Sequence, residues 1–540
     1  MDRFLPRHLH YTSIPVIKNA PLLAPPAGAG KDGRWPTAVF SHGLGGNRNA
    51  YSQVAGSAAS HGVVVFCPEH RDGSAAVSFV RIPAAQDRYF VRSTRRAVPY
   101  RRIPHDATDE VHELRNEQLR VRLWELGLLH EAILALDDDE DDDDDGSGGE
   151  KFTNLNRSTP KEALGQFAGR LHVRDPGSII FMGHSFGAAT VTQFLKSVFY
   201  ADEIGAASST DTDTEAEGND PLYVPAPGSA IRRQITPRNV TILLDMWCFP
   251  LLAKSTKALF DRPLPAYARP KARDGDDAVD PPPGGRALLA VESQDFYKWT
   301  EHLHAKARIL SPDPRAAVVE ASAFAPSPPP PASSAGDGAP GRLPAKPAFF
   351  WVRGAAHLNQ SDFGLLFPLL TQRVFGSRAP ERALRLNLRA ILQVLRANGV
   401  PVAPTAATDL VDGGSTLPVP LSAAVRDKLA GASSGDDSGS GSDAEGASVA
   451  IDGVFDDAAI LEQVEGGKGN IEAWEWIDVV GMGRVADDAD GKVKDSDQVA
   501  EKQEPDMAGV IEPGVASTDS AGGDGGQEPV AAKVAGATAA

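Results

Sequence analysis

The stretch "SIIFMGHSFGAATVTQFLKSVF", residues 178–199, joins an apolar run to an amphipathic run through one serine with a glycine two residues away on each side. Its centre, GHSFG, fits the G-x-S-x-G pattern, in which a sharp turn between a strand and a helix exposes a nucleophilic serine. Such a turn strains the serine backbone and needs small neighbours, which Gly183 and Gly187 provide. The stretch therefore predicts a strand, a tight turn that carries Ser185, and a helix.

The same alternation of strand and helix extends along the chain. The apolar runs do not alternate with polar residues, which is typical of strands covered on both faces. Strands followed by helical segments predict an α/β fold with a mostly parallel, doubly covered sheet. The expected strands are 37–43, 62–70, 178–184, 239–247, 287–293 and 348–354, and the expected helices are 47–61, 109–136, 186–200, 296–308 and 381–398.

The negative charge of the chain is concentrated in its C-terminal end. The 540 residues carry a net charge of -18, and residues 431–540 hold 24 acidic and 6 basic side chains. The preceding 430 residues are therefore balanced in charge. Because nucleic-acid binding needs a basic face, this composition argues against a nucleic-acid partner.

Cysteine content and apolar stretches give an expectation about location. The two cysteines, Cys67 and Cys248, form no disulfide framework and no zinc pattern, which favours a reducing compartment. The opening "MDRFLPRHLHYTSIPV" lacks the apolar stretch of a signal peptide, and no run approaches the length that spans a bilayer. We expect a soluble cytoplasmic protein.

Composition also predicts the domain organisation. Residues 1–430 are expected to form one catalytic domain, and 431–540 an acidic low-complexity tail that is mostly disordered, with an unknown partner. Within the tail, "IEAWEWIDVVGMG" (471–483) is apolar enough to dock on the domain or on a partner, and a transiently helical piece is an equally open interpretation. Segments poor in apolar residues are expected as disordered insertions near 137–150, 202–220, 270–286 and 324–346.

The acidic run before Gly146 resembles a calcium loop only superficially. Phe152 stands where such a loop needs a bidentate glutamate, so we interpret the run as a solvated charge cluster. The sequence predicts no metal site and no cofactor.

A nucleophilic serine needs an oxyanion hole, a base and an acid. Backbone N–H donors are expected from Phe186, directly after the serine, and from Leu44 in the glycine-rich loop "FSHGLGGNR" (40–48). His357 follows the last expected strand, where this type of site places its base. The acid is less determined, because Glu292, Asp295 and Asp245 all lie at or after strand ends.

Several motifs in the same order resemble the platelet-activating-factor acetylhydrolase family, the serine-dependent phospholipase A2 branch of the α/β-hydrolases. The resemblance covers residues 35 to about 370, interrupted by the insertions, and implies an α/β-hydrolase fold with Ser185, Asp245 and His357 as the catalytic triad and Leu44 and Phe186 as oxyanion donors. It favours Asp245 over Asp295. The motifs are "FSHGLGGNRNAYS", "EHRDGSA", "ELRNEQLRVR", "GHSFGAAT", "LLDMWCFP" and "GAAHLNQSDF".

The resemblance implies an esterase that removes a short or oxidised sn-2 acyl chain from a glycerophospholipid. The triad by itself predicts acyl transfer to serine and then to water without a metal. A general short-acyl carboxylesterase and a non-catalytic scaffold are the alternatives, because a fold does not fix a substrate. Seven arginines and three aromatic residues between 81 and 102 suggest peripheral contact with phospholipid head groups, or a basic loop that pairs with acidic segments.

Overall fold

The computed structural model describes one compact unit that falls within Thr12–Gln503. A second unit, Met1–Tyr11 with Glu504–Ala540, lies outside the described residues except for Tyr11. The described residues are 11–14, 16–24, 33–82, 95–138, 154–156, 158–204, 220–268, 284–312, 314, 347–405, 409–410, 457–461 and 471–477.

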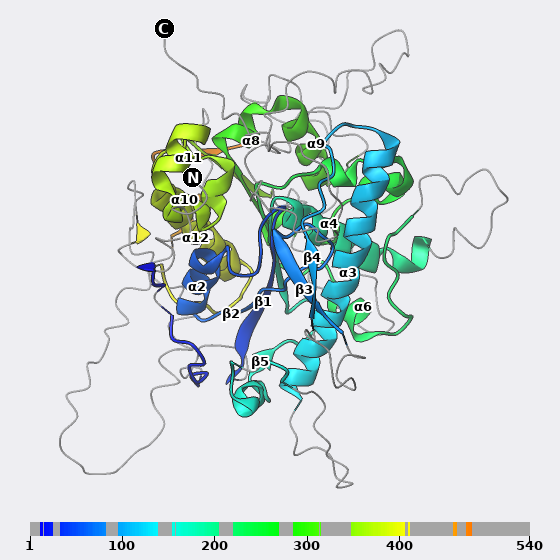
Figure 1. Cartoon of the computed structure of the whole chain (residues 1–540), viewed down its shortest axis with the longest axis vertical. Coiled ribbons are helices and arrows are strands. Elements are labelled where there is room, and N and C mark those ends of the chain that lie inside the picture. Colours follow the sequence, from blue (N-terminus) through cyan, green and yellow to red (C-terminus); the bar gives the residue numbers. More distant parts are fainter. Residues whose placement is uncertain are drawn as a thin grey trace, which may run out of the picture. The chain divides into compact units, whose positions relative to one another are not determined.

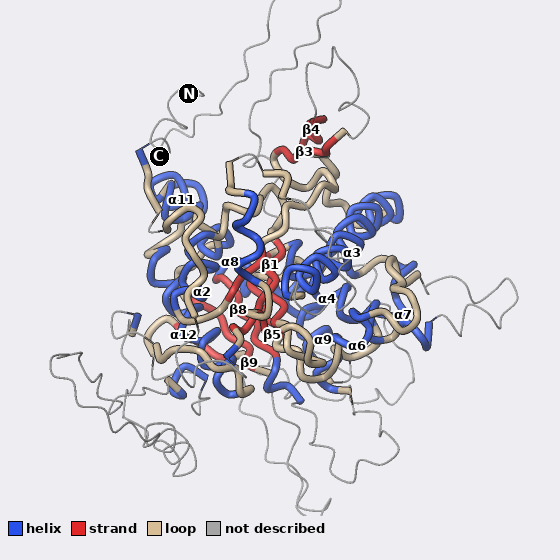
Figure 2. The backbone as a smooth tube through the Cα atoms, turned by 90° about the horizontal axis from the view of Figure 1, so that it is seen from below, coloured by secondary structure: helices blue, strands red, loops and turns tan. Residues whose placement is uncertain are grey.

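Strands from distant parts of the chain form one eight-stranded sheet among the described residues (Figures 1 and 2). Its order is β10-β9-β8-β7-β6-β1-β2, and β5 pairs with β1. Every pairing is parallel except that of β10 with β9. The strands are β1 (Trp35–Ser41), β2 (Val64–Phe66), β5 (Leu171–His172), β6 (Ile180–His184), β7 (Thr241–Leu244), β8 (Leu288–Ser293), β9 (Ala348–Val352) and β10 (Trp474–Trp476).

Successive side chains of the central strands enter two different cores. Phe181 and Leu243 pack with one cluster, which also includes side chains of α3, α4 and α9. Met182 and Ile242 pack with the other, which includes side chains of α2 and α12. Figure 2 shows the helices on both sides of the sheet. A mostly parallel sheet covered on both faces confirms the predicted α/β-hydrolase fold class.

The helices follow the predicted pattern closely. Those beside the sheet are α2 (Ser52–Ser60), α3 (Asp109–Asp137), α4 (Phe186–Phe199), α6 (Ala230–Gln234), α9 (Thr300–Leu310) and α12 (Pro380–Ala397). Shorter ones are α7 (Lys257–Phe260), α8 (Gln294–Lys298), α10 (Phe363–Leu366) and α11 (Pro368–Phe375).

Two expected elements differ from the structure. The helix expected over 47–61 begins only at Ser52, because residues 47–51 form a turn. The helix expected over 296–308 is two helices, α8 and α9, that are separated at Trp299, whose φ of -80° and ψ of 82° are not helical. The indole of Trp299 instead stacks on His302 with ring centres 4.2 Å apart.

The basic segment 81–102 overlaps a hairpin that the sequence did not predict. Strands β3 (Val77–Arg81) and β4 (Arg95–Pro99) pair antiparallel, and Arg81 lies opposite Arg95. Residues 83–94, which carry two of the seven arginines, lie outside the described residues. The expected insertions also fall largely outside them, at 139–153, 205–219, 269–283 and 315–346.

Part of the acidic C-terminal region belongs to the described fold. β10 adds an edge strand beside β9, and the side chain of Trp474 stacks on Phe350 with ring centres 4.8 Å apart. The buried Arg389 on α12 forms two hydrogen bonds, of 2.6 and 2.8 Å, with the carboxylate of Asp457. The boundary predicted near residue 430 stays a prediction, but residues 457–461 and 471–477 contribute to the core.

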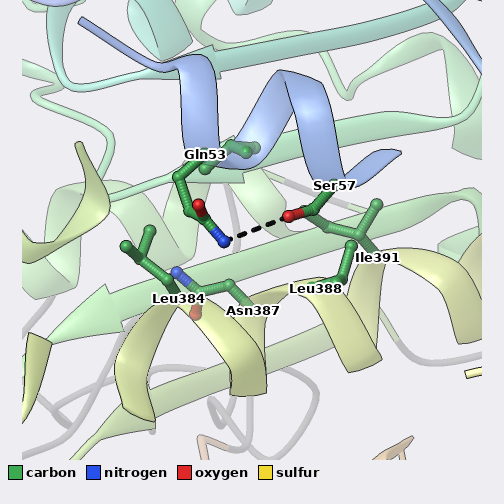
Figure 3. A pocket seen from close by; sticks show the side chains of 7 residues that line it. Gln53, Ser57, Leu384, Asn387, Leu388 and Ile391 are labelled. Atoms are coloured by element: carbon green, nitrogen blue, oxygen red, sulfur yellow. Dashed lines mark hydrogen bonds between the residues drawn. The ribbon is translucent and has the colours of Figure 1, made fainter. Parts of the chain in front are cut away.

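A shallow recess lies between α2 and α12, where Gln53 Nε2 donates to Ser57 Oγ at 3.2 Å (Figure 3). None of the candidate site residues lines it, so we assign it no part in the chemistry. No helix in the described part of the chain combines the length and the hydropathy of a membrane-spanning segment.

Candidate active site

Ser185 occupies the sharp turn between β6 and α4. Its φ is +55° and its ψ is -122°, a conformation that costs a non-glycine residue free energy and is typical of strained functional turns. Its N–H donates to the carbonyl of Leu244 at 2.9 Å, which anchors the turn to the neighbouring strand β7. A Cβ added at Gly187 would lie 2.0 Å from the carbonyl oxygen of Ser41, so the first turn of α4 packs directly on β1. The glycine pattern thus lets the helix approach the sheet.

The carboxylate of Asp245 and the imidazole of His357 meet at the same edge of the sheet. Asp245 directly follows β7, with a φ of +43°, and is completely buried. One carboxylate oxygen accepts the N–H of Ser293 at 2.5 Å, and the other lies 3.0 Å from His357 Nδ1. His357 begins a short 3₁₀ helix, His357–Gln360, after β9. Residues 112 positions apart therefore form one hydrogen-bonded pair.

The other two acids considered from sequence are placed differently. Glu292 is buried in β8, where it pairs with Lys306 on α9. Asp295 lies on α8. Burial and the charge of Asp245 raise the pKa of its carboxyl group to about 6, although a hydrogen bond with the backbone of His357 opposes this shift. Of the three candidates, Asp245 is the one that hydrogen-bonds the imidazole in the structure.

Burial favours the neutral form of the imidazole. Burial and, secondly, the charge of Lys306 together lower the pKa of His357 to about 3. An ionised carboxylate can only accept a hydrogen bond, so Nδ1 carries the proton and points it at Asp245. Nε2 is then the acceptor nitrogen. This is the tautomer that a general base toward a serine hydroxyl requires.

Aromatic rings hold the imidazole in place. The ring of Phe296 stacks on His357 with centres 4.2 Å apart and planes 4° apart, and His184 contacts it at 4.5 Å. His184 Nδ1 lies 2.8 Å from the hydroxyl of Tyr51, which accepts the N–H of Gly43 at 3.0 Å. The Tyr51 hydroxyl therefore links His184 to the backbone of Gly43. Sequence reasoning did not assign these roles, although His184 lies within the G-x-S-x-G motif.

The loop that should supply the second oxyanion donor lies against Ser185. A Cβ added at Gly43 would be 3.0 Å from Ser185 Cβ. The N–H of Gly45 donates to Ser74 at 2.7 Å, and that of Gly46 donates to Gly43 at 3.2 Å. Leu44 is half-buried between these anchored residues. Its backbone N–H stays a predicted donor.

Phe186, the other predicted donor, is the first residue of α4. The first N–H groups of a helix have no acceptor within it, and the helix dipole favours negative charge there. The position of Phe186 therefore suits an N–H that stabilises an oxyanion.

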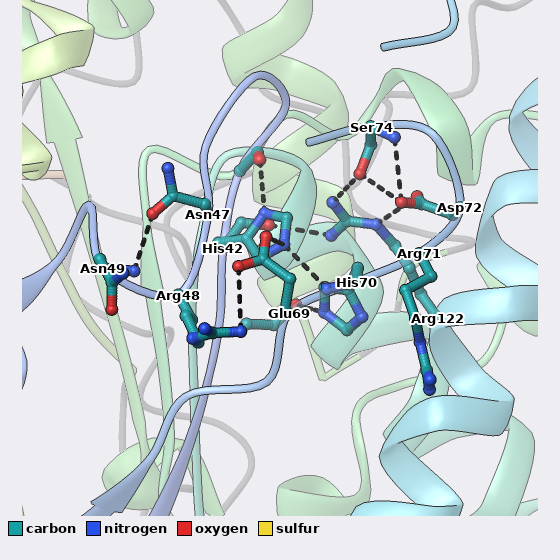
Figure 4. Close-up of polar contacts among 12 residues, drawn as sticks. His42, Asn47, Arg48, Asn49, Glu69, His70, Arg71, Asp72, Ser74 and Arg122 are labelled. Atoms are coloured by element: carbon teal, nitrogen blue, oxygen red, sulfur yellow. Dashed lines mark hydrogen bonds and ion pairs between the residues drawn. The ribbon is translucent and has the colours of Figure 1, made fainter. Parts of the chain in front are cut away.

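The buried side chain of Arg122 anchors the loop 40–48, here called the oxyanion loop (Figure 4). Arg122 of α3 donates to Asp72 at 2.7 Å, to the carbonyl of His42 at 2.9 Å and to Ser74 at 2.5 Å. Its guanidinium lies 4.2 Å from the ring centre of Phe186. Arg122 thus connects the residues that flank both predicted donors.

His184, Asp245 and His357 offer potential metal-ligand atoms within 4.8 Å of one another, and they are the only such group found in the described part of the chain. Two of these side chains face each other through the hydrogen bond between His357 Nδ1 and Asp245, and His184 Nδ1 is bonded to Tyr51. The arrangement is that of a hydrogen-bonded array. We assign it no metal.

Comparison with known proteins supports the family. Residues 3–264 match the family described as "Platelet-activating factor acetylhydrolase, isoform II". A Schizosaccharomyces pombe protein named "Putative phospholipase A2" is 27% identical over 391 residues, which cover 72% of each chain. Platelet-activating factor acetylhydrolases of Bos taurus and Cavia porcellus are 35% and 34% identical, over 30% of this chain and 32% of theirs. Just under half of the chain, residues 3–264, therefore matches the platelet-activating factor acetylhydrolase family.

Proposed function

We propose that this protein hydrolyses the sn-2 ester of glycerophospholipids that carry a short or oxidised acyl chain at that position. Its class, a carboxylic ester hydrolase, follows from the family that residues 3–264 match. The alignments cover about a third of each animal relative named above, so the particular substrate is inferred and not inherited. The observation that supports the chemistry best is the hydrogen bond between Asp245 and His357 at the sheet edge where β6 ends in the strained turn of Ser185.

In the proposed reaction, the hydroxyl oxygen of Ser185 attacks the carbonyl carbon of the ester. His357 Nε2 takes the hydroxyl proton, and Asp245 stabilises the imidazolium that forms. The N–H groups of Leu44 and Phe186 donate to the oxyanion. His357 then gives its proton to the departing lysophospholipid oxygen, and the acyl group remains on Ser185.

Water completes the cycle. His357 removes a proton from the water molecule as it attacks the acyl-serine, and the same N–H groups stabilise the second oxyanion. Collapse of this intermediate returns the proton to Ser185 and releases the fatty acid. No step in this scheme requires a cofactor or a metal.

A substrate panel tests the proposal. The wild-type chain should hydrolyse phosphatidylcholines with two-carbon and oxidised sn-2 chains much faster than those with sixteen-carbon chains, with and without a chelator. Ser185→Ala should abolish these rates. Equal turnover of p-nitrophenyl acetate by the wild type and Ser185→Ala would instead favour the non-catalytic scaffold, and turnover of simple esters without phospholipids would favour the general carboxylesterase.

Peripheral membrane contact is part of the proposal. Leu369 and Val374 on α11 are 80% and 48% exposed, and this helix begins eleven residues after His357. On the β3–β4 hairpin, Phe79 is 56% exposed beside the basic strand β4. Apolar side chains next to arginines suit a phospholipid surface. We expect a cytoplasmic protein that binds membranes peripherally, and vesicle sedimentation with Leu369→Ser and Phe79→Ser tests this contact.

A further inference from the structure

Directly behind the Asp245–His357 pair lies a second buried carboxyl group, that of Glu292. Strands β7 and β8 run parallel with Leu244 opposite Val291, so Asp245 and Glu292, the next residues along, are neighbours. Neither side chain is exposed. The parallel register thus places the two carboxyl groups on adjacent strands, and each of them shifts the pKa of the other.

Two carboxylates cannot hydrogen-bond unless one of them carries a proton, because the ionised form only accepts. Both oxygens of Asp245 already accept bonds, from Ser293 and from His357. Glu292 Oε2 accepts from Lys306 Nζ, while its Oε1 is buried and has no donor directed at it among the described residues. If Oε1 carries a proton, the resulting hydroxyl can donate a hydrogen bond to Asp245, and this buried atom is no longer without a partner.

We propose that Glu292 is a positioning residue that stays protonated at neutral pH and donates a hydrogen bond to Asp245, while Lys306 supplies the counter-charge of Asp245. This inference rests on the proposed function of the Asp245–His357 pair. The buried group then holds one positive and one negative charge. Asp245 keeps its full charge for orienting His357, and no second carboxylate competes with it.

The charges in the site agree with this distribution. Burial, followed by the charge of Asp245, raises the pKa of Glu292, and Lys306 opposes this shift. Burial also raises the pKa of Asp245, which Lys306 and the bond from Ser293 lower. Burial and the charge of Asp245 both disfavour the ionised form of Glu292, which agrees with a proton on this residue. Lys306 itself is completely buried on α9, and its ammonium lies 4.6 Å from the ring centre of Phe296, the ring that stacks on His357.

The remaining titratable groups nearby leave this balance unchanged at neutral pH. On α9, burial lowers the pKa of His302 well below its usual value, so it is neutral. After β7, burial raises the pKa of Cys248 to about 12, so its thiol keeps its proton. On α8, burial raises the pKa of Asp295 to about 6, so it is largely ionised at pH 7.

Infrared spectroscopy of the full-length protein observes this proton without any substrate. At pH 7 the wild type should show the carbonyl band of a buried, protonated carboxyl group, and Glu292→Gln should lack it. The matched control Glu301→Gln, an exposed glutamate at the start of α9, should keep the band. Identical spectra of the wild type and Glu292→Gln in this region would overturn the proposal, whether or not the protein hydrolyses phospholipids.

The pH dependence of kcat/KM gives a second, functional test. If Glu292 is protonated, Glu292→Gln removes no charge, and its amide can donate the same bond. The pH at which kcat/KM falls on the acidic side of the profile, its acidic limb, should then equal that of the wild type. Lys306→Met removes a positive charge, so the limb should move to higher pH by about one unit. Lys298→Met on α8, an exposed lysine, is the control and should leave it in place. An acidic limb that moves to lower pH in Glu292→Gln would mean that Glu292 is ionised and would contradict the proposal.

Discussion

Replacing Arg122 by methionine should destabilise the protein and also remove the hydrogen bond that anchors the oxyanion loop at His42. The guanidinium is completely buried and donates to Asp72, Ser74, Thr190 and the carbonyl of His42. Methionine fills a similar volume but leaves the carboxylate of Asp72 buried without its cationic partner. Breaking one side of a buried ion pair typically costs about 3–5 kcal/mol.

The expected loss in the free energy of unfolding for Arg122→Met is therefore about 3–5 kcal/mol, measured by urea unfolding at pH 7. Arg120→Met on the same helix is the matched control. The side chain of Arg120 is 38% exposed and pairs with Glu113 and Asp220, so its loss should cost less than about 1 kcal/mol. A double variant with Asp72→Asn should recover part of the loss, because no unpaired charge then remains.

The contribution of Asp72 to stability should depend on pH in a direction that its pKa determines. Burial alone would raise the pKa of Asp72, but Arg122 and His70 hold it below its usual value. A carboxyl with a depressed folded-state pKa stabilises the protein above its unfolded pKa of about 4, and this contribution is lost as the pH falls through the folded value. The difference in stability between the wild type and Arg122→Met should therefore narrow as the pH drops below about 4. A cost under about 1 kcal/mol at pH 7 would mean that the Arg122–Asp72 pair contributes no more than an exposed salt bridge.

Three further substitutions follow from particular contacts. Gly187→Ala should prevent folding, because the added Cβ would overlap the backbone of β1, and the helical circular dichroism signal should be lost. The control Gly56→Ala should fold, because nothing lies within 4 Å of its added Cβ. Asp457→Ala removes the carboxylate that forms a buried ion pair with Arg389, and it should cost about 3–5 kcal/mol in thermal unfolding if residues 457–461 belong to the core. Asp245→Asn should lower kcat about 10⁴-fold while the fold remains intact, and a loss below tenfold would speak against its proposed role.

Much of the fold was readable from the sequence because its central strands are continuous apolar runs. The runs that became β1, β6, β7, β8 and β9 were all predicted. The predicted fold class and enzyme class are confirmed, and residues 3–264 match the predicted family. The β3–β4 hairpin was missed because its strands are largely exposed and lack the continuous apolar run of a buried strand. β10 was left open because "WEW" lies in an acidic region and pairs with a strand more than a hundred residues earlier.

The site could be predicted only in part. The roles of Ser185, Asp245 and His357 stay predictions, although the structure joins the last two by a hydrogen bond. The sequence could not show which buried side chains surround these residues. Glu292 and Lys306 come together only because β8 and α9 pack against each other, and no local pattern signals such a contact.

The central claim is that Ser185 is the nucleophile, and covalent trapping tests it most directly. The full-length protein is treated with a fluorophosphonate, and the modified peptide is identified by mass spectrometry while the remaining esterase activity is measured. We predict one adduct on Ser185, formed in proportion to the activity lost, with no adduct in Ser185→Ala. Full activity in Ser185→Ala, or complete inactivation with the label on another residue, would contradict the account.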